Sequence, residues 1–161
     1  MRRIILCLVA LFMLYVPTNE AKAQDKGDFR FGTRAAFYTR AKAFGVGVYG
    51  TYCITDWLNI EPGVHAICKK GSSVDVYCDF QVPLEIATYW YVFPIVGVSV
   101  NEIGSKSANA HGWSCGLNLG LGTSYQFSSH WDAHAQVKWM GQSAKNHKSP
   151  VIVAAGIGYN F

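Results

Sequence analysis

The stretch that decides the fold is the end of the chain, Val151-Ile-Val-Ala-Ala-Gly-Ile-Gly-Tyr-Asn-Phe161. Every second residue in it belongs to an apolar row: Val151, Val153, Ala155, Ile157, Tyr159 and Phe161. The intervening residues are apolar or small at first and end on the polar Asn160. A period of two indicates a β-strand with one apolar face. Because an unpaired apolar edge invites aggregation in water, the row favours a strand that closes a barrel and turns its apolar face to lipid.

The start of the chain has the pattern of a secretory signal peptide. A basic beginning, Met1-Arg2-Arg3, precedes an apolar run from Ile4 to Val16 that is too short to span a membrane as a helix. Ala21-Lys22-Ala23 then supplies the small residues of a cleavage site. We therefore expect residues 1–23 to be removed after export and residues 24–161 to form one domain.

The charge of the exported part is weak. The whole chain carries +4, and removing the three cations and one carboxylate of residues 1–23 leaves +2. So small a charge, on an exported protein, argues against a nucleic-acid partner.

Alternation of apolar and polar residues recurs in segments of roughly the length that a tilted membrane strand needs. It predicts eight strands: Gly27–Arg40, Phe44–Ile54, Trp57–Cys68, Val74–Ala87, Tyr89–Ile103, Trp113–Phe127, Trp131–Gly141 and Val151–Phe161. The predicted fold class is all-β, an eight-stranded antiparallel up-and-down transmembrane β-barrel. The fifth segment is apolar on both parities and contains Pro94, so the pattern leaves its orientation open.

Connection lengths and aromatic residues predict the orientation. The connections after the second, fourth and sixth strands are short, and those after the third, fifth and seventh are longer. In outer-membrane barrels the short turns are periplasmic, so we expect both termini on that side. Aromatic residues gather near both strand ends, as in interfacial girdles. The alternative is a soluble barrel, in which the apolar parity would point inward and the charged parity outward.

Three internal motifs and the chain end carry a family resemblance: Trp57-Leu-Asn-Ile-Glu-Pro-Gly63, Gln81-Val-Pro-Leu-Glu-Ile86, Gly97-Val-Ser-Val-Asn101, and the terminal Gly156, Tyr159 and Phe161. With them the chain resembles the small outer-membrane β-barrel proteins of Gram-negative bacteria, in the OmpA/OmpX-like group, and looks most like the barrel domain common in Bacteroidetes. The resemblance implies an outer-membrane location and makes Gly156, Tyr159 and Phe161 the signal read by the barrel-assembly machinery. Ala154 departs from that signal, which usually has a polar residue there.

The resemblance specifies the fold better than the activity. It implies a structural or surface-interaction role: envelope integrity, adhesion or lipid contact. A lipid A-modifying enzyme and an accessory barrel of a secretion or assembly system are the alternatives. It names no protein partner.

An eight-stranded barrel is narrow enough for its side chains to fill it, which argues against a general pore. The inward parity is rich in charge of both signs, and we expect it to form an interior polar plug in which opposite charges pair. The predicted plug consists of Arg30, Arg34, Glu61, His65, Asp79, Glu85, Asp132, His134 and Lys138. A proton or ion path through the same residues is the alternative.

His65 and His134 are the candidate catalytic residues, because some eight-stranded barrels act on lipid A with a histidine, a serine and a carboxylate. No hydroxyl stands at a spacing that fits such a site. We therefore expect buried, paired histidines and no catalytic residue, metal or cofactor.

Cys68 and Cys78 share one parity and flank the expected hairpin tip at residues 69–77. The exported compartment permits a disulfide between them, and the cross-strand geometry decides whether it forms. Basic residues fall in the longer loops, where they are either solvated or bind outer-membrane lipids including lipopolysaccharide: Lys69, Lys70, Lys106, Lys145 and Lys148.

Overall fold

The computed structural model describes residues 26–68, 73–101, 114–142 and 149–161. The predicted signal peptide and the five loop lysines lie outside these residues. Within these ranges no helix is long and apolar enough to cross a membrane. The strands are β1 (Phe29–Tyr38), β2 (Ala43–Thr55), β3 (Leu58–Cys68), β4 (Ser73–Gln81), β5 (Leu84–Ala87), β6 (Trp90–Asn101), β7 (Ser114–Gln126), β8 (Trp131–Gln142) and β9 (Val151–Asn160).

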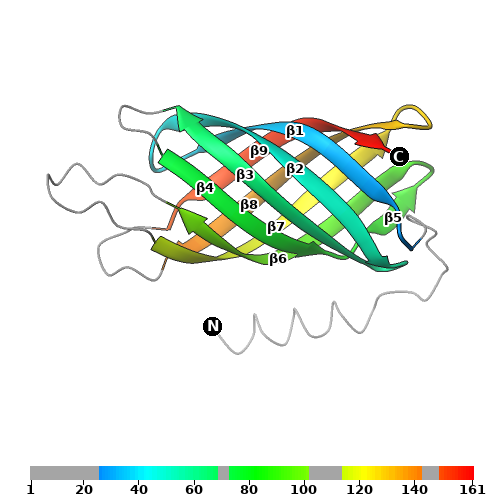
Figure 1. Ribbon diagram of the computed structural model, residues 1–161, viewed down its shortest axis with the longest axis horizontal. Coiled ribbons are helices and arrows are strands. Elements are labelled where there is room, and N and C mark those ends of the chain that lie inside the picture. The colour runs from blue at the N-terminus through cyan, green and yellow to red at the C-terminus, as the bar shows by residue number, and fades with distance from the viewer. Residues whose placement is uncertain (1–25, 69–72, 102–113, 143–148) are drawn as a thin grey trace, which may run out of the picture.

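The strands close into a barrel (Figure 1). Each strand pairs antiparallel with its neighbour, and β9 returns to β1 with a register running from Arg30 opposite Asn160 to Tyr38 opposite Ile152. Both β4 and β5 pair with β6, so they are two parts of one strand, interrupted at Val82 and Pro83. Proline has no N–H to give to a ladder, which explains an interruption there. The barrel therefore has eight strands, and the predicted fold class is confirmed.

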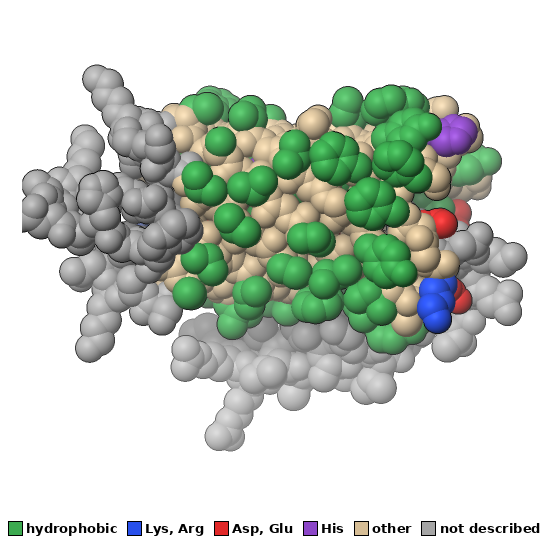
Figure 2. Space-filling model, viewed as in Figure 1, with side chains coloured by type: hydrophobic (Ala, Val, Ile, Leu, Met, Phe, Trp, Pro, Cys, Tyr) green, Lys and Arg blue, Asp and Glu red, His purple; other side chains and the backbone are tan. Residues whose placement is uncertain are grey.

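The outer wall of the barrel is apolar. Burial alternates residue by residue, and on β7 the leucines Leu117, Leu119 and Leu121 are 45–60 % exposed while Asn118 between them is buried. Figure 2 shows hydrophobic side chains spread over the visible wall. The charged parity lies inside, so the alternative of a soluble barrel with an apolar interior is wrong. An apolar band of this kind suits a bilayer.

Exposed aromatic side chains collect at the end of the barrel that carries the short turns. Trp57 is 60 % exposed and Phe161 76 % exposed. Tyr159 is surrounded there by other rings, with centroids 5.1 Å away in Trp131 and 5.0 Å away in Phe161. The other aromatics exposed in the predicted girdle at this end are Tyr89, Trp90, Tyr125, Phe127 and Trp131. We call this the turn-side end and the opposite one the loop-side end.

An apolar cluster lies inside the barrel at the loop-side end. There Tyr38, Met140 and Ile152, each at most 1 % exposed, pack with Ala36, Ala43, Ile67 and Ala154. The structure also settles the orientation of the fifth predicted strand: in β6, Phe93 and Ile95 point inward, while Val96 and Val98 face outward.

Candidate functional site

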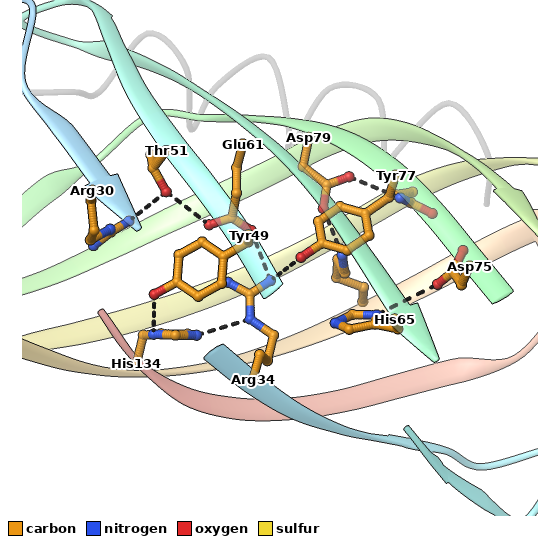
Figure 3. Close-up of polar contacts among 12 residues, drawn as sticks. Arg30, Arg34, Tyr49, Thr51, Glu61, His65, Asp75, Tyr77, Asp79 and His134 are labelled. Carbon is orange, nitrogen blue, oxygen red and sulfur yellow. Dashed lines mark hydrogen bonds and ion pairs between the residues drawn. The ribbon is translucent and has the colours of Figure 1, made fainter. Parts of the chain in front are cut away.

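A connected group of polar side chains fills the middle of the barrel (Figure 3), with Arg34 of β1 at its centre. Its Nη1 donates to Glu61 Oε1 of β3 at 2.8 Å and to Tyr77 Oη of β4 at 2.9 Å. Its Nε donates to His134 Nε2 of β8 at 2.9 Å. The guanidinium also lies 4.3 Å from the ring centroid of Tyr49 on β2, a cation–π distance. One side chain therefore joins five strands.

The bond from Arg34 fixes the tautomer of His134. A guanidinium can only donate, so His134 Nε2 must accept and the ring proton sits on Nδ1. Nδ1 lies 3.1 Å from Tyr49 Oη, which is placed to accept that proton. The ring of His134 is thus neutral and held on both sides. Gly156 of β9 pairs with both Arg34 and His134, and a Cβ there would lie 2.8 Å from His134 Cε1, so a glycine is what lets these two side chains meet.

A second ion pair adjoins this group on the turn side. Arg30 Nη1 donates to Asp132 Oδ2 at 3.0 Å, and its Nη2 donates to Thr51 Oγ1 at 3.3 Å. Thr51 in turn donates to Glu61 Oε2 at 3.3 Å. The two arginines are therefore linked through Thr51 and Glu61.

A third group is centred on Asp79 of β4. Lys138 Nζ donates to Asp79 Oδ2 at 2.6 Å, and Asn118 Nδ2 donates to Oδ1 at 2.8 Å. Ser99 Oγ donates to Asn118 Oδ1 at 3.1 Å. The ammonium of Lys138 lies 3.9 Å from the ring centroid of Tyr77, which connects this group to the first.

The fourth group lies beneath the apolar cluster. Tyr38 Oη donates to Asp75 Oδ2 at 2.8 Å and is 3.0 Å from His65 Nδ1. Because the single hydroxyl proton goes to Asp75, Tyr38 Oη accepts from His65 Nδ1. His65 Nδ1 lies 3.7 Å from Asp75 Oδ2, and both side chains are almost fully buried.

The buried charges nearly balance. The described interior holds three permanent cations, Arg30, Arg34 and Lys138, and four carboxylates, Glu61, Asp75, Asp79 and Asp132. Each cation contacts a carboxylate at 3.0 Å or less. Asp75 is held by a tyrosine and a histidine instead. Charges removed from water persist only with such partners, so the middle of the barrel is filled by charged side chains that pair with one another.

Eight of the nine residues predicted for the plug are buried inside the barrel: Arg30, Arg34, Glu61, His65, Asp79, Asp132, His134 and Lys138. Glu85 is a correction, because its side chain is exposed. It lies in β5, beyond the interruption at Val82 and Pro83, where the four-residue strand pairs with β6 alone at the turn-side end.

Three tyrosines that connect the groups, Tyr38, Tyr49 and Tyr77, were not predicted as interior residues. Each is at most 2 % exposed. Their position in the inward parity is a signal that was present in the sequence: Tyr77 stands between Asp75 and Asp79, and Tyr49 stands two residues before Thr51.

The cysteine prediction is wrong in its geometry. Cys78 of β4 lies opposite Pro62, whereas β3 and β4 end their pairing at Ile67 and Ser73, next to Cys68. The two cysteines are thus separated by about six residues along the ladder, on the order of 20 Å at ~3.3 Å per residue and far beyond disulfide reach. The pairing runs to Ser73, so the hairpin tip is shorter than expected. Neither Cys68 nor Cys78 is in a disulfide within the described residues.

The two histidines do not form an accessible catalytic site. His65 and His134 are 0 % and 4 % exposed and point into the barrel, whereas a lipid substrate would contact the outer wall. Among the described residues, no group of three His, Cys, Asp or Glu side chains is arranged to hold a metal ion.

Comparisons with known proteins agree on the fold. No protein-family model and no curated protein matches the chain. The solved N-terminal β-barrel domain of Pseudomonas aeruginosa OprF matches with a TM-score of 0.70 and 16 % identity, covering 86 % of this chain and 100 % of that one. OprG from the same organism matches with a TM-score of 0.59 and 17 % identity, covering 86 % and 97 %. Yersinia pestis Ail, solved in complex with the heparin analogue sucrose octasulfate, matches with a TM-score of 0.50 and 12 % identity, covering 84 % and 99 %.

The chain therefore has the fold of small transmembrane β-barrels. The resemblance to a Bacteroidetes barrel domain stays a prediction.

Proposed function

We propose that the protein is an integral outer-membrane β-barrel of a Gram-negative bacterium with a structural or surface-interaction role, and that it is not a general pore. Residues 1–23 act as its signal peptide. The barrel-assembly machinery inserts it through the signal that contains Gly156, Tyr159 and Phe161. The observation that carries the proposal is the combination of an apolar outer wall with ion pairs inside the barrel: the wall suits lipid, and paired charges across a narrow interior argue against an open path for solutes.

The closed interior is tested by reconstituting the purified protein into lipid vesicles and following the flux of a small sugar. We expect no flux above that of empty vesicles, while a general porin in parallel vesicles gives rapid flux. Sugar entry through the reconstituted protein would overturn the proposal.

The surface role concerns the loop-side end. The exposed Arg40 and Lys42 lie in the β1–β2 turn at this end, and five more lysines stand in the sequence between the strands that end there. Cations near the membrane surface attract anionic headgroups, so lipopolysaccharide is the proposed contact. The Ail complex supports this as a fold-level precedent, because that protein was solved with a polysulfated ligand.

The loop charges are tested by replacing Lys69, Lys70, Lys106, Lys145 and Lys148 with glutamine and measuring how much lipopolysaccharide stays bound to the purified protein. We expect retention to fall in this variant and to persist in a control with Lys26→Gln, which alters the opposite end. Unchanged retention in the loop variant would refute the lipopolysaccharide contact.

A lipid A-modifying enzyme is the second class. The inward position of both histidines speaks against it. Mass analysis of lipid A from cells with and without the protein decides the matter: the proposal expects identical acylation, and a missing or additional acyl chain would establish the enzyme.

A further inference from the structure

A small, partly open pocket lies near the turn-side end of the barrel interior. Its volume is about 20 Å³, and its wall is formed by Arg30, Asn59, Gln81, Pro83, Tyr91, Phe93 and Ser124. Gln81 is the last residue of β4 before the interruption of that strand, and Arg30 is near the start of β1. The two side chains come from strands that are not neighbours, so they meet across the interior.

Two residues of this lining carry a hydrogen-bond donor that has no partner among the described residues. Arg30 uses Nη1 and Nη2 for Asp132 and Thr51, but its Nε is buried and unbonded. Gln81 Nε2 is likewise buried and unbonded. The two residues are 6 % and 1 % exposed. Buried N–H groups in folded proteins are nearly always satisfied, so two unpaired donors beside one cavity point to an acceptor between them.

The size of the cavity limits what that acceptor can be. A water molecule needs roughly 10–15 Å³, so a space of about 20 Å³ has room for one water-sized species. Asn59 and Ser124 line the same space with groups that can donate or accept. A water there would have the two to four polar partners that buried waters require.

Water and a halide ion are the two acceptors of that size, and the net charge of the barrel interior favours water. The interior already has one more carboxylate than permanent cations, and Arg30 is already paired with Asp132 at 3.0 Å. A halide would add a second uncompensated negative charge, which a site removed from water disfavours. We propose that the cavity is a buried water site, in which one water accepts hydrogen bonds from Arg30 Nε and Gln81 Nε2 and so braces the end of β4 against β1.

The direct test is a crystal structure of the full chain in detergent from crystals soaked in bromide. We expect one ordered water about 2.7–3.2 Å from both nitrogens and no anomalous bromide signal there. An anomalous peak in the cavity would overturn the proposal in favour of an anion site. An empty cavity, with the two donors bonded elsewhere, would overturn it altogether.

A matched pair of variants tests the ligands in solution. Gln81→Met removes the donor at similar side-chain volume, and Gln136→Met makes the same change at a buried, unbonded glutamine outside the cavity. Magnetisation transfer from water to the Nε proton of Arg30, measured by NMR, should persist in Gln136→Met and be lost in Gln81→Met. Equal transfer in both variants would remove Gln81 from the site, and the crystal experiment remains decisive if Gln81→Met does not fold.

Discussion

Arg34 Nη1 lies 2.8 Å from Glu61 Oε1, and both side chains are 1 % exposed. The residues are 27 positions apart and stand on β1 and β3, with β2 between them. The pair therefore holds three strands in register from inside the barrel. It also explains why the interior tolerates charge: each ion has taken a partner in exchange for the water that it lost.

Replacing Arg34 with methionine should destabilise the barrel by about 3–5 kcal/mol, because Glu61 would remain buried without its cation. Tyr77 and His134 would lose a donor as well. Urea unfolding of the protein in phospholipid bilayers measures the change in the free energy of unfolding.

The double variant Arg34→Met/Glu61→Met is the control for that prediction. Removing both charges leaves no unpaired ion, so the double variant should be more stable than Arg34→Met alone. Two effects that simply add would show that the ion pair contributes no coupling.

Leu119 tests the lipid-facing wall. It lies near the middle of β7, is 45 % exposed and belongs to the apolar outer row. Leu119→Arg should cost about 2–4 kcal/mol in bilayers, as a charge near the bilayer midplane does. Ser128→Arg, in the exposed β7–β8 turn, should change stability by no more than about 0.5 kcal/mol. Equal costs at the two positions would contradict the assignment of the wall to lipid.

Gly97 of β6 tests the packing around Asp79. A Cβ at this position would lie 2.2 Å from Asp79 Oδ1 and 2.5 Å from the carbonyl oxygen of Cys78. Gly97→Ala should therefore push the carboxylate away from Lys138 and cost about 1–3 kcal/mol. Gly50→Ala is the matched control, since its Cβ would meet only the ring of Phe29 at 3.3 Å. A smaller loss for Gly97→Ala than for Gly50→Ala in thermal unfolding would count against the described packing.

Alkylation of the cysteines tests the register between β3 and β4. Cys68 and Cys78 are too far apart along the ladder to bond, and neither is in a disulfide within the described residues. Peptide mapping of the protein after alkylation in denaturant, without reductant, should show both Cys68 and Cys78 modified. A peptide pair joined by a Cys68–Cys78 disulfide would refute the β3–β4 register.

Much of the fold could be predicted because the alternation in this chain is regular. On β8 the pattern Trp131, Ala133, Ala135, Val137 faces outward without exception, and on β9 the closing strand pairs with β1 as the apolar row required. The break in the fourth strand could not be predicted from Pro83 alone, because Pro62 and Pro94 lie within continuous strands. The exposed position of Glu85 follows from that break.

The sequence predicts which residues lie inside the barrel, but it does not predict which of them contact one another. Parity places Arg34, Glu61 and His134 inside, yet which of them meet depends on the stagger between strands, and no pattern along one strand contains that stagger. The apolar cluster around Met140 and Ile152 was missed for a related reason: one apolar residue on each of several strands gives no local signal, and the cluster forms only when the barrel closes.

We propose that the barrel crosses the outer membrane with its short turns in the periplasm. In a cysteine-free version, single cysteines are placed at Lys42 of the β1–β2 turn and at Asp56 and Ser128 of the short turns, and intact cells are treated with a membrane-impermeant thiol reagent. With this orientation we expect Lys42→Cys to be labelled on intact cells, and Asp56→Cys and Ser128→Cys to be labelled only after the outer membrane is permeabilised. Labelling of both short turns on intact cells, with Lys42→Cys protected, would reverse the orientation, and equal labelling of all three positions would contradict a membrane-spanning barrel.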